Sequence, residues 1–402
     1  MREALPDGVA LLEVLENQGN VHAWVVRKGR EVEYFPLGPA AGIAPLVEDF
    51  RAAFTSRDDE ARWLDAGGRL RAKLEAPLAA ALEDASTLYL ALDGALATVP
   101  LGLLPDGEAG ARRFLLERCV IVHVTGGAGL VMAAHADRSR PGYGLVAFGG
   151  IDYENADYAT GGRGPARNRV QPLPETGAEA DAVAARFRQR FPDAEARTLA
   201  GKAATEAAWQ RVTPQARYVH AATHGFFDLE NLRHAIAETG ARDAAGPAIF
   251  ASLAEPGRAG TFRSLGGWNP RLLSGIVLAG ANDGGVHEDG WLTAADLAGQ
   301  DLTGVELVVL SACDPGRGEF AAGEGVLGLA RALTVAGARR FVLPLWPVPN
   351  ADTRELMDRF YDGLWAEAPL PAEAALRAAQ RSMLAEDRKR NAFRPGRWGL
   401  GW

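Results

Sequence analysis

The sequence predicts an α/β protein with a mostly parallel sheet that helices cover on both faces. Strand and helix patterns alternate after residue 143, which is typical of βαβ units. The composition agrees, because 48% hydrophobic and 23% charged residues are globular values and supply enough apolar side chains for a large core. The 402 residues exceed one ordinary domain, so two or three domains are expected.

The first part of the chain, residues 1–138, is predicted to be a separate α/β unit. Its elements are defined by apolar alternation or by helical spacing. Strands are predicted at residues 9–13, 21–26, 30–35, 87–92 and 120–124, and helices at 43–54 and 60–82. The polar stretch His135–Gly142, which contains proline and glycine, is the predicted linker. The second unit is therefore expected to span residues 139–402.

The second unit carries the regular alternation of strands and helices. Strands are predicted at residues 144–148, 195–199, 218–223, 276–279, 305–312 and 341–346, and helices at 175–191, 205–212, 293–298, 325–336, 352–364 and 372–384. Thr176 and Thr293 are the expected helix caps. Residues 226–275 are long and loop-like, which predicts an insertion over the active face, because long loops in compact domains are often functional.

Charge and cysteine content exclude several classes of protein. The net charge of −8 argues against general nucleic-acid binding, since no basic field is present. The two cysteines, Cys119 and Cys313, exclude a secreted disulfide framework and favour a reducing cytoplasm. The histidines are scattered and there is no Cys-x-x-Cys pair, so neither a metal nor another cofactor is predicted. No apolar run approaches about 18 residues, so no membrane span is expected.

Two predicted strands end on reactive side chains. Residues 218–225 read Tyr-Val-His-Ala-Ala-Thr-His-Gly and lead to His224, while residues 307–313 read Leu-Val-Val-Leu-Ser-Ala-Cys and lead to Cys313. In parallel sheets, functional groups collect beyond the carboxyl ends of the strands. An imidazole within hydrogen-bond reach generates the thiolate that attacks an acyl carbon. The pair therefore predicts a cysteine-nucleophile hydrolase, with the amide of Gly225 able to face a developing oxyanion.

Structural interpretations compete with this assignment. A cysteine at the end of an apolar strand is often a small core residue, which is the interpretation we adopt for Cys119. His220 lies four residues before His224 on the same face of the strand and is a rival base. Because it lies deeper in the strand, it is interpreted as a hydrogen-bonded core histidine.

Several further motifs are spread over nearly the whole chain in a fixed order. They are Leu5–Gly8, Asp93–Gly94, Leu173–Glu179, His220–Phe227, Asp289–Thr293, Val308–Val326, Leu329–Leu333, Ala336–Ala338 and Leu345–Tyr361. On these residues the chain resembles the CHAT peptidases, a branch of the caspase-like fold that also includes separases and metacaspases. The resemblance implies a caspase-like α/β/α sandwich for residues 139–402. It also implies a pseudo-protease or regulatory lobe for residues 1–138.

The resemblance also implies an activity, that of a cysteine endopeptidase with a Cys–His dyad and no cofactor. His224 would act as general base and acid, and Cys313 would form a thioester that water hydrolyses. The amides of Gly225 and Cys313 would form the oxyanion hole. The implied partner is a protein substrate, for example a gasdermin or another effector in bacterial antiviral defence, together with an activating protein or ligand.

Three candidates for substrate binding, Trp346, Asn350 and Asp352, lie at or near the predicted strand 341–346, because residues there help to shape the specificity pocket in caspase-like folds. The fourth, Asp289, lies before the predicted cysteine strand and is an acidic candidate for a pocket that takes a basic residue. Relatives commonly have an aspartate where this chain has Asn350, so the preferred residue at the cleavage site stays open. Two other functions also remain open: a catalytically silent interaction module that keeps the fold, and another thiol acyl-transfer hydrolase such as an amidase.

Overall fold

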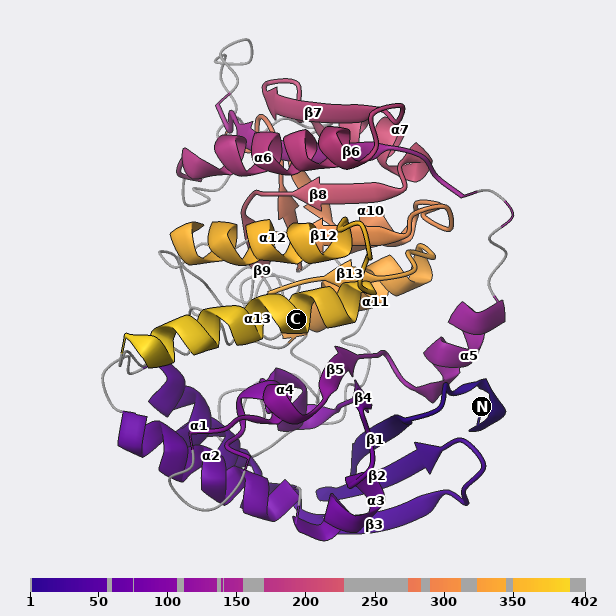
Figure 1. Ribbon diagram of the computed structural model, residues 1–402, viewed down its shortest axis with the longest axis vertical. Helices are drawn as coiled ribbons and strands as arrows, with labels where there is room; N and C mark the ends of the chain where they lie inside the picture. Colours follow the sequence, from indigo (N-terminus) through magenta and orange to yellow (C-terminus); the bar gives the residue numbers. More distant parts are fainter. Residues whose placement is uncertain are drawn as a thin grey trace, which may run out of the picture. The chain divides into compact units, whose positions relative to one another are not determined.

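The protein is described here from a computed structural model (Figure 1). The structure describes residues 2–55, 60–74, 76–106, 112–135, 139, 141–154, 170–227, 274–282, 290–311, 324–344 and 350–390. These residues form two compact units. Unit 1 contains the described residues up to 134 together with 377–390, and unit 2 contains those of 135–227 and 274–376. The roles predicted for residues 1–138 and 139–402 stay predictions.

Unit 1 is built around a mixed sheet with the strand order β3-β2-β1-β4-β5. The strands are β1 (Val9–Asn17), β2 (Asn20–Arg27), β3 (Glu33–Pro39), β4 (Thr87–Ala91) and β5 (Val120–His123). The β1–β2 and β2–β3 pairs are antiparallel, whereas β4 is parallel to both β1 and β5. The α-helices are α1 (Ala44–Thr55), α2 (Glu60–Leu74), α3 (Ala79–Leu82), α4 (Leu115–Arg118) and α5 (Gly127–His135). The described 3-10 helices are η1 (Arg2–Ala4), η2 (Ala40–Gly42), η3 (Ala76–Leu78), η4 (Gly94–Thr98) and η5 (Leu101–Leu103).

One expectation for unit 1 was wrong, and one helix was not predicted. The single helix predicted for residues 60–82 is divided, because α2 ends at Leu74 and α3 begins only at Ala79. Pro77 lies in this break, and proline lacks the amide that a helix interior requires. Helix α5 was not predicted, because its sequence, Gly-Ala-Gly-Leu-Val-Met-Ala-Ala-His, has almost no polar residues to produce helical alternation.

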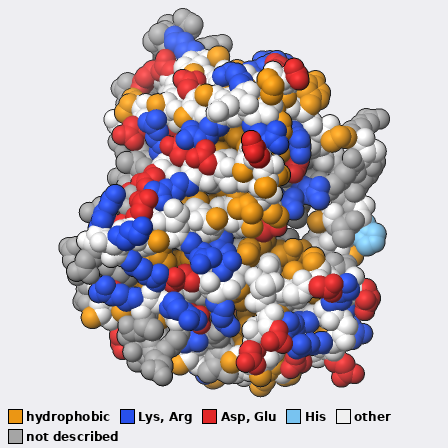
Figure 2. Space-filling view, viewed as in Figure 1, with side chains coloured by type: hydrophobic (Ala, Val, Ile, Leu, Met, Phe, Trp, Pro, Cys, Tyr) orange, Lys and Arg blue, Asp and Glu red, His pale blue; other side chains and the backbone are white. Residues whose placement is uncertain are grey.

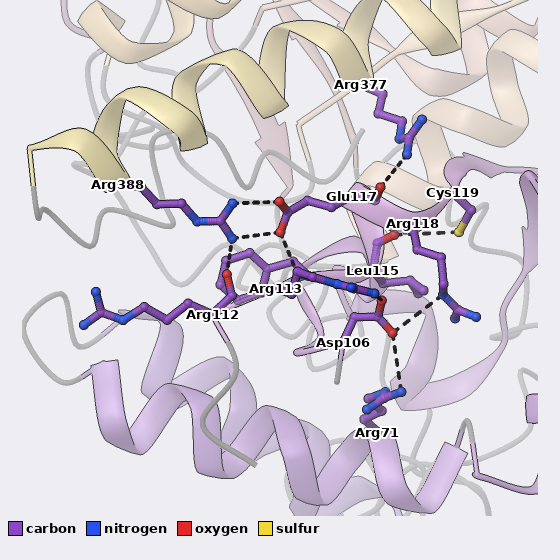
Figure 3. A network of polar contacts seen from close by, with 11 residues as sticks. Arg71, Asp106, Arg112, Arg113, Leu115, Glu117, Arg118, Cys119, Arg377 and Arg388 are labelled. Atoms are coloured by element: carbon purple, nitrogen blue, oxygen red, sulfur yellow. Dashed lines mark hydrogen bonds and ion pairs between the residues drawn. The ribbon is translucent and has the colours of Figure 1, made fainter. Parts of the chain in front are cut away.

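A network of arginines and carboxylates joins α4 to the part of α13 (Ala372–Lys389) that belongs to unit 1 (Figure 3). The Arg377 guanidinium donates to the carbonyl groups of Leu116 and Glu117, at 2.6 and 2.7 Å. Arg388 donates to both carboxylate oxygens of Glu117, at 2.7 and 2.8 Å. Asp106, only 5% exposed, lies within ion-pair distance of three further arginines. The network compensates the cost of burying these carboxylates.

Unit 2 contains a second five-stranded sheet, with the order β13-β12-β8-β6-β7. The strands are β6 (Leu145–Ile151), β7 (Ala196–Gly201), β8 (Tyr218–Ala221), β12 (Leu307–Leu310) and β13 (Phe341–Val342). Every neighbouring pair is parallel. The predicted α/β fold class with a mostly parallel sheet is therefore confirmed, and the arrangement is consistent with a caspase-like fold.

Helices cover both faces of this sheet. Helices α6 (Glu175–Arg190) and α12 (Asn350–Leu364) lie side by side on one face (Figure 1). Tyr218 and His220 of β8 contact aromatic or polar side chains of these two helices. Val219 and Ala221, which alternate with them along β8, point to the opposite face. They belong to the apolar cluster that includes side chains from α7 (Glu206–Val212), α10 (Ala294–Ala298) and α11 (Glu324–Val335). This alternation fixes which side chains each face receives.

A smaller antiparallel sheet corrects the assignment of residues 276–279 to the parallel sheet. Its order is β11-β10-β9, with β9 (Gly225–Phe227), β10 (Ser274–Val277) and β11 (Trp291–Thr293). Gly275 in the central strand permits close packing, because a Cβ there would lie 2.2 Å from the carbonyl oxygen of Leu292 and 2.5 Å from the ring of Phe226. An apolar run of four residues does not indicate which sheet receives the strand.

The two predicted caps behave differently. Thr293 is confirmed, since its hydroxyl accepts a hydrogen bond from the Asp296 amide at 3.2 Å. Thr176 as a cap is wrong, because α6 already begins at Glu175. Its hydroxyl instead donates to the Leu173 carbonyl at 2.7 Å and accepts from the Gly150 amide at 2.9 Å. Thr176 therefore joins the start of α6 to the end of β6.

Ion pairs also connect elements on the surface of unit 2. Arg186 of α6 lies 2.9 Å from both Asp358 and Asp362 of α12. Arg217, just before β8, lies 2.7 Å from Glu306, just before β12. On the face in Figure 2, Lys and Arg side chains lie among Asp and Glu side chains over much of the described surface. Exposed pairs of this kind contribute at most about 1 kcal/mol each.

Candidate active site

The candidate site lies beyond the carboxyl ends of β8 and β12, which are adjacent and in register. Ala221 pairs with Leu310, and the amide of Ser311 donates to the Ala221 carbonyl at 2.8 Å. His224 follows Ala221 by three residues, and Cys313 follows Leu310 by three residues. Cys313 lies outside the described residues, and Ser311 is the last described residue before it. The described geometry therefore comes from the histidine side of the predicted pair.

The imidazole of His224 has a defined hydrogen-bond partner. Its Nε2 lies 2.7 Å from the carbonyl oxygen of Gln171, and the residue is only 4% exposed. A carbonyl oxygen can only accept, so Nε2 must carry the proton in this hydrogen bond. In the neutral ring Nδ1 is then the unprotonated nitrogen, which is the state that a general base requires.

The aromatic ring of Tyr153 supports His224 from a second direction. The ring centroids are 5.2 Å apart with an interplanar angle of 56°. The hydroxyl of Thr223 donates to the Val277 carbonyl at 2.5 Å, so it must accept from the Tyr153 hydroxyl, which lies 3.0 Å away. Residues 153, 223 and 277 come from three separate segments of the chain and together fix the backbone just before His224.

The backbone amide of Gly225 is directed away from the neighbouring strand. Gly225 pairs with Ile276 in the antiparallel β9–β10 ladder, and the Val277 amide donates to the His224 carbonyl at 2.8 Å. This bond identifies Gly225 and Ile276 as a non-hydrogen-bonded pair, in which both amides face away from the partner strand. Since β9 is an outer strand of the small sheet in the described residues, the Gly225 amide faces its open edge.

His220, the rival base, is buried inside the structure. It is 0% exposed, its Nδ1 lies 3.0 Å from the Tyr361 hydroxyl, and its Nε2 lies 3.2 Å from a carboxylate oxygen of Glu179. Nδ1 therefore has a hydrogen-bond partner in α12, whereas Nε2 lies near the carboxylate of α6 without hydrogen-bond geometry among the described residues. The burial of His220 agrees with its interpretation as a core histidine, but within the part of the chain that the structure describes only one of its ring nitrogens is hydrogen-bonded.

The remaining predicted site residues are placed only in part. Asp289 and Trp346 lie outside the described residues. Asn350 is the first residue of α12, and Asp352 is half-buried in the first turn of that helix. Because two of the four substrate-binding candidates lie outside the described residues, their shared role stays a prediction.

The second cysteine lies in the other unit. Cys119 directly follows α4, is 1% exposed, and its Sγ lies 3.7 Å from the Leu115 carbonyl oxygen (Figure 3). Within the described ranges, no group of three or more His, Cys, Asp or Glu side chains could hold a metal ion. Within the same ranges, none of the helices combines the length and the apolar character needed to cross a membrane.

Comparison with known proteins identifies the family. The model of the CHAT domain matches residues 64–400 of the 402 residues. The chain belongs to the CHAT-domain family. CHAT is a caspase-like, peptidase-related family, and the resemblance inferred from the motifs is therefore confirmed. The match begins within α2 of unit 1, so it extends beyond the predicted peptidase domain of residues 139–402.

Part of the CHAT chain is also similar to a much longer protein. It is 42% identical over 73 residues to tetratricopeptide repeat protein 28 of Mus musculus, which covers 18% of this chain and 3% of that protein. The identity to the same protein of Homo sapiens is 39% over 90 residues, which covers 22% of this chain and 4% of the relative. The CHAT chain thus matches only a small part of these relatives.

Several residues around His224 were not predicted from the sequence. Gln171 contributes only a backbone carbonyl, which any residue type could supply, so its side chain gave no signal. Tyr153 and Asn282 follow strands as isolated polar residues without a recognisable spacing. Glu179 was noted as part of the family pattern, but its contact with His220 depends on the packing of α6 against β8.

Proposed function

We propose that this CHAT-domain protein is a cysteine endopeptidase in which Cys313 is the nucleophile and His224 the general base. The observation that carries the proposal is the register of β8 and β12, which gives the two residues equivalent positions beyond adjacent strand ends. Neighbouring strands are about 4.8 Å apart. Chain connectivity limits the Cα of Cys313 to about 7 Å from that of Ser311. These limits allow the Cys313 thiol to come within reach of the His224 imidazole.

The proposed reaction divides peptide hydrolysis into two acyl-transfer steps. Nδ1 of His224 takes the proton of the Cys313 thiol, and the thiolate attacks the carbonyl carbon of the substrate. The carbon–nitrogen bond breaks while the imidazolium donates its proton to the departing amine. Water then attacks the thioester, with Nδ1 accepting its proton, and the acid product leaves as the thiol is restored.

The direction of the Gly225 amide supports an oxyanion hole. This amide faces away from β10 and follows His224 directly in the chain. Preorganised amides that hydrogen-bond to the developing oxyanion are typical of acyl-transfer sites, and loss of one donor costs about 100- to 1,000-fold in kcat. We assign this role to Gly225 together with the amide of Cys313.

The proposed substrate is a specific protein partner rather than a small amide. Asp289, Trp346, Asn350 and Asp352 remain the candidates for recognition of its side chains. The family resemblance supports a cytoplasmic role in bacterial defence, for example cleavage of a gasdermin, under the control of an activating protein or ligand. These assignments of partner, location and trigger rest on the resemblance alone.

Cleavage of a peptide library by the full chain, with product ends read by mass spectrometry, tests the activity. The wild type and a Cys119→Ser control are expected to give the same cleavage profile, because Cys119 is buried in unit 1. Cys313→Ala and His224→Ala are expected to abolish cleavage. A profile retained by Cys313→Ala would exclude the proposed nucleophile.

The same experiment separates the alternatives. Turnover of small amides or esters without peptide cleavage, still dependent on Cys313, would favour another thiol acyl-transfer hydrolase. Absence of any turnover in every condition that includes candidate activators, together with unselective alkylation of Cys313, would favour a silent interaction module.

A further inference from the structure

The side chain of Asn282 holds one segment of backbone from both sides. Its Oδ1 accepts from the Val170 amide at 2.7 Å, and its Nδ2 donates to the Val170 carbonyl at 3.0 Å. The second hydrogen of Nδ2 bonds to Oε1 of Glu154 at 2.8 Å. With Oδ1 and Nδ2 exchanged, the side-chain NH₂ group would face the Val170 amide, and the side-chain oxygen would face the Val170 carbonyl and Oε1 of Glu154. The contacts therefore determine the orientation of Asn282.

The segment that Asn282 holds leads directly to His224. Gln171 follows Val170, and its carbonyl oxygen accepts the hydrogen bond from Nε2 of His224. Residues 170–173 belong to no helix or strand, and Gln171 itself is exposed. Because regular secondary structure does not fix this carbonyl, the paired hydrogen bonds one residue earlier supply the restraint.

Asn282 also restrains the second group that contacts the imidazole. Its backbone amide donates to the carbonyl oxygen of Tyr153 at 2.9 Å. The Tyr153 ring packs against His224, and the Tyr153 hydroxyl donates to Thr223. One residue thus connects the two segments that contact the ring of His224, through its side chain in one case and its backbone in the other.

We infer that Asn282 is a positioning residue that selects the Nε2–H tautomer of His224. It acts through the carbonyl of Gln171 and keeps Nδ1 of the neutral ring unprotonated. This inference rests on the proposed role of His224 as general base. Without the restraint, the carbonyl moves relative to the ring, both tautomers become populated, and the fraction of molecules with an unprotonated Nδ1 decreases. A displacement of about 1 Å at a reacting group costs about 100-fold in rate.

The tautomer is measured directly by long-range ¹H–¹⁵N NMR of the full chain with ¹⁵N-labelled histidine, with the His224 signal assigned from its absence in His224→Ala. We expect the Nε2–H tautomer in the wild type and a mixture of tautomers in Asn282→Ala. Asn282→Asp is a second, nearly isosteric variant that keeps an acceptor for Val170 but lacks the donor. It is expected to change the tautomer in the same direction.

A matched control is Thr213→Val, which removes a hydroxyl that donates to the Trp209 carbonyl at 2.8 Å before the amino end of β8. This variant also loses a side-chain hydrogen bond in unit 2 but leaves the segment at Val170 unchanged, so the His224 tautomer should not change. An unchanged Nε2–H population in both folded Asn282 variants would overturn the inference, as would a mixture in the wild type.

The peptidase assay distinguishes failure of the inference about Asn282 from failure of the proposed function. If the wild type cleaves peptides, Asn282→Ala should lower kcat by about 100-fold with a smaller change in KM. An unaltered kcat in that variant would also overturn the inference. If the wild type cleaves nothing, the proposed function fails, and the tautomer measurement alone still decides whether Asn282 sets the state of His224.

Discussion

Replacement of His220 should destabilise unit 2, whereas replacement of His224 should leave its stability almost unchanged. His220 is 0% exposed and faces Glu179, which is 5% exposed, and the hydroxyl of Tyr361. Removing one partner of a buried polar pair costs about 1–3 kcal/mol, because the other is left buried without it. His224 donates to the carbonyl of Gln171, an exposed residue, so the loss is about 1 kcal/mol or less.

A double-substitution cycle sharpens this prediction. His220→Leu and Glu179→Leu should each cost about 1–3 kcal/mol, because each leaves the other polar group buried. The double variant places two apolar side chains of suitable volume in the same space. It should therefore be more stable than either single variant, since apolar replacement of a whole buried pair is often neutral or stabilising.

Hydrogen–deuterium exchange of peptides from β8 and β12 measures this cost within unit 2, without assuming that the whole chain unfolds in one step. His220→Leu should accelerate exchange by roughly 5- to 150-fold, and His224→Leu by less than about fivefold. The reasoning would be refuted by His220→Leu exchanging like the wild type. A loss of Cys313 reactivity in that variant without loss of protection would identify His220 as the functional base.

Two further predictions concern packing and pH. Gly275→Ala should lower the free energy of unfolding by about 1–3 kcal/mol, because its Cβ would meet the backbone oxygen of Leu292 at 2.2 Å. Gly299→Ala is the matched control in urea denaturation, because its Cβ would make only contacts of 3.5 Å or longer. Equal urea midpoints for the two variants would contradict the packing around Gly275. Burial acts to raise the pKa of Glu117, but the hydrogen bonds and charge of Arg388 outweigh it and lower that pKa below its ordinary value. Because the folded-state pKa is lowered, the stabilisation is present above the unfolded-state pKa of about 4.3 and is lost as the pH falls through the folded-state pKa. The urea midpoint of unit 1 should therefore decrease less below about pH 4 in Arg388→Ala than in the wild type, and parallel pH profiles would show that this pair does not contribute.

The sequence was sufficient for the fold class and for the two strands that lead to the candidate site. Residues 218–223 and 305–312 are mostly apolar, and both contain strands of the parallel sheet. Thr293 was predicted correctly as a cap because its capping box is complete within four residues. Such local patterns require no knowledge of distant contacts.

The rest depended on contacts between segments far apart in the chain. The hydrogen bond between His224 and Gln171 joins residues 53 positions apart, and Asn282 reaches Val170 across 112 positions. The assignment of β10 to a separate antiparallel sheet depends on its pairing with β9 and β11, and this pairing leaves no mark in a four-residue pattern. Thr176 has the composition of a cap but serves as a connection to Gly150, which only the tertiary packing of α6 explains.

The measurement that tests the central claim most directly is the rate at which iodoacetamide alkylates Cys313 as a function of pH, followed by mass spectrometry in the full chain. If the imidazole of His224 deprotonates the thiol, Cys313 should react well below pH 8.5, the ordinary thiol pKa, and far faster than the buried Cys119. His224→Ala should shift the profile of Cys313 towards that of a free thiol. Identical profiles for Cys313 in the wild type and in His224→Ala would contradict the proposed pairing.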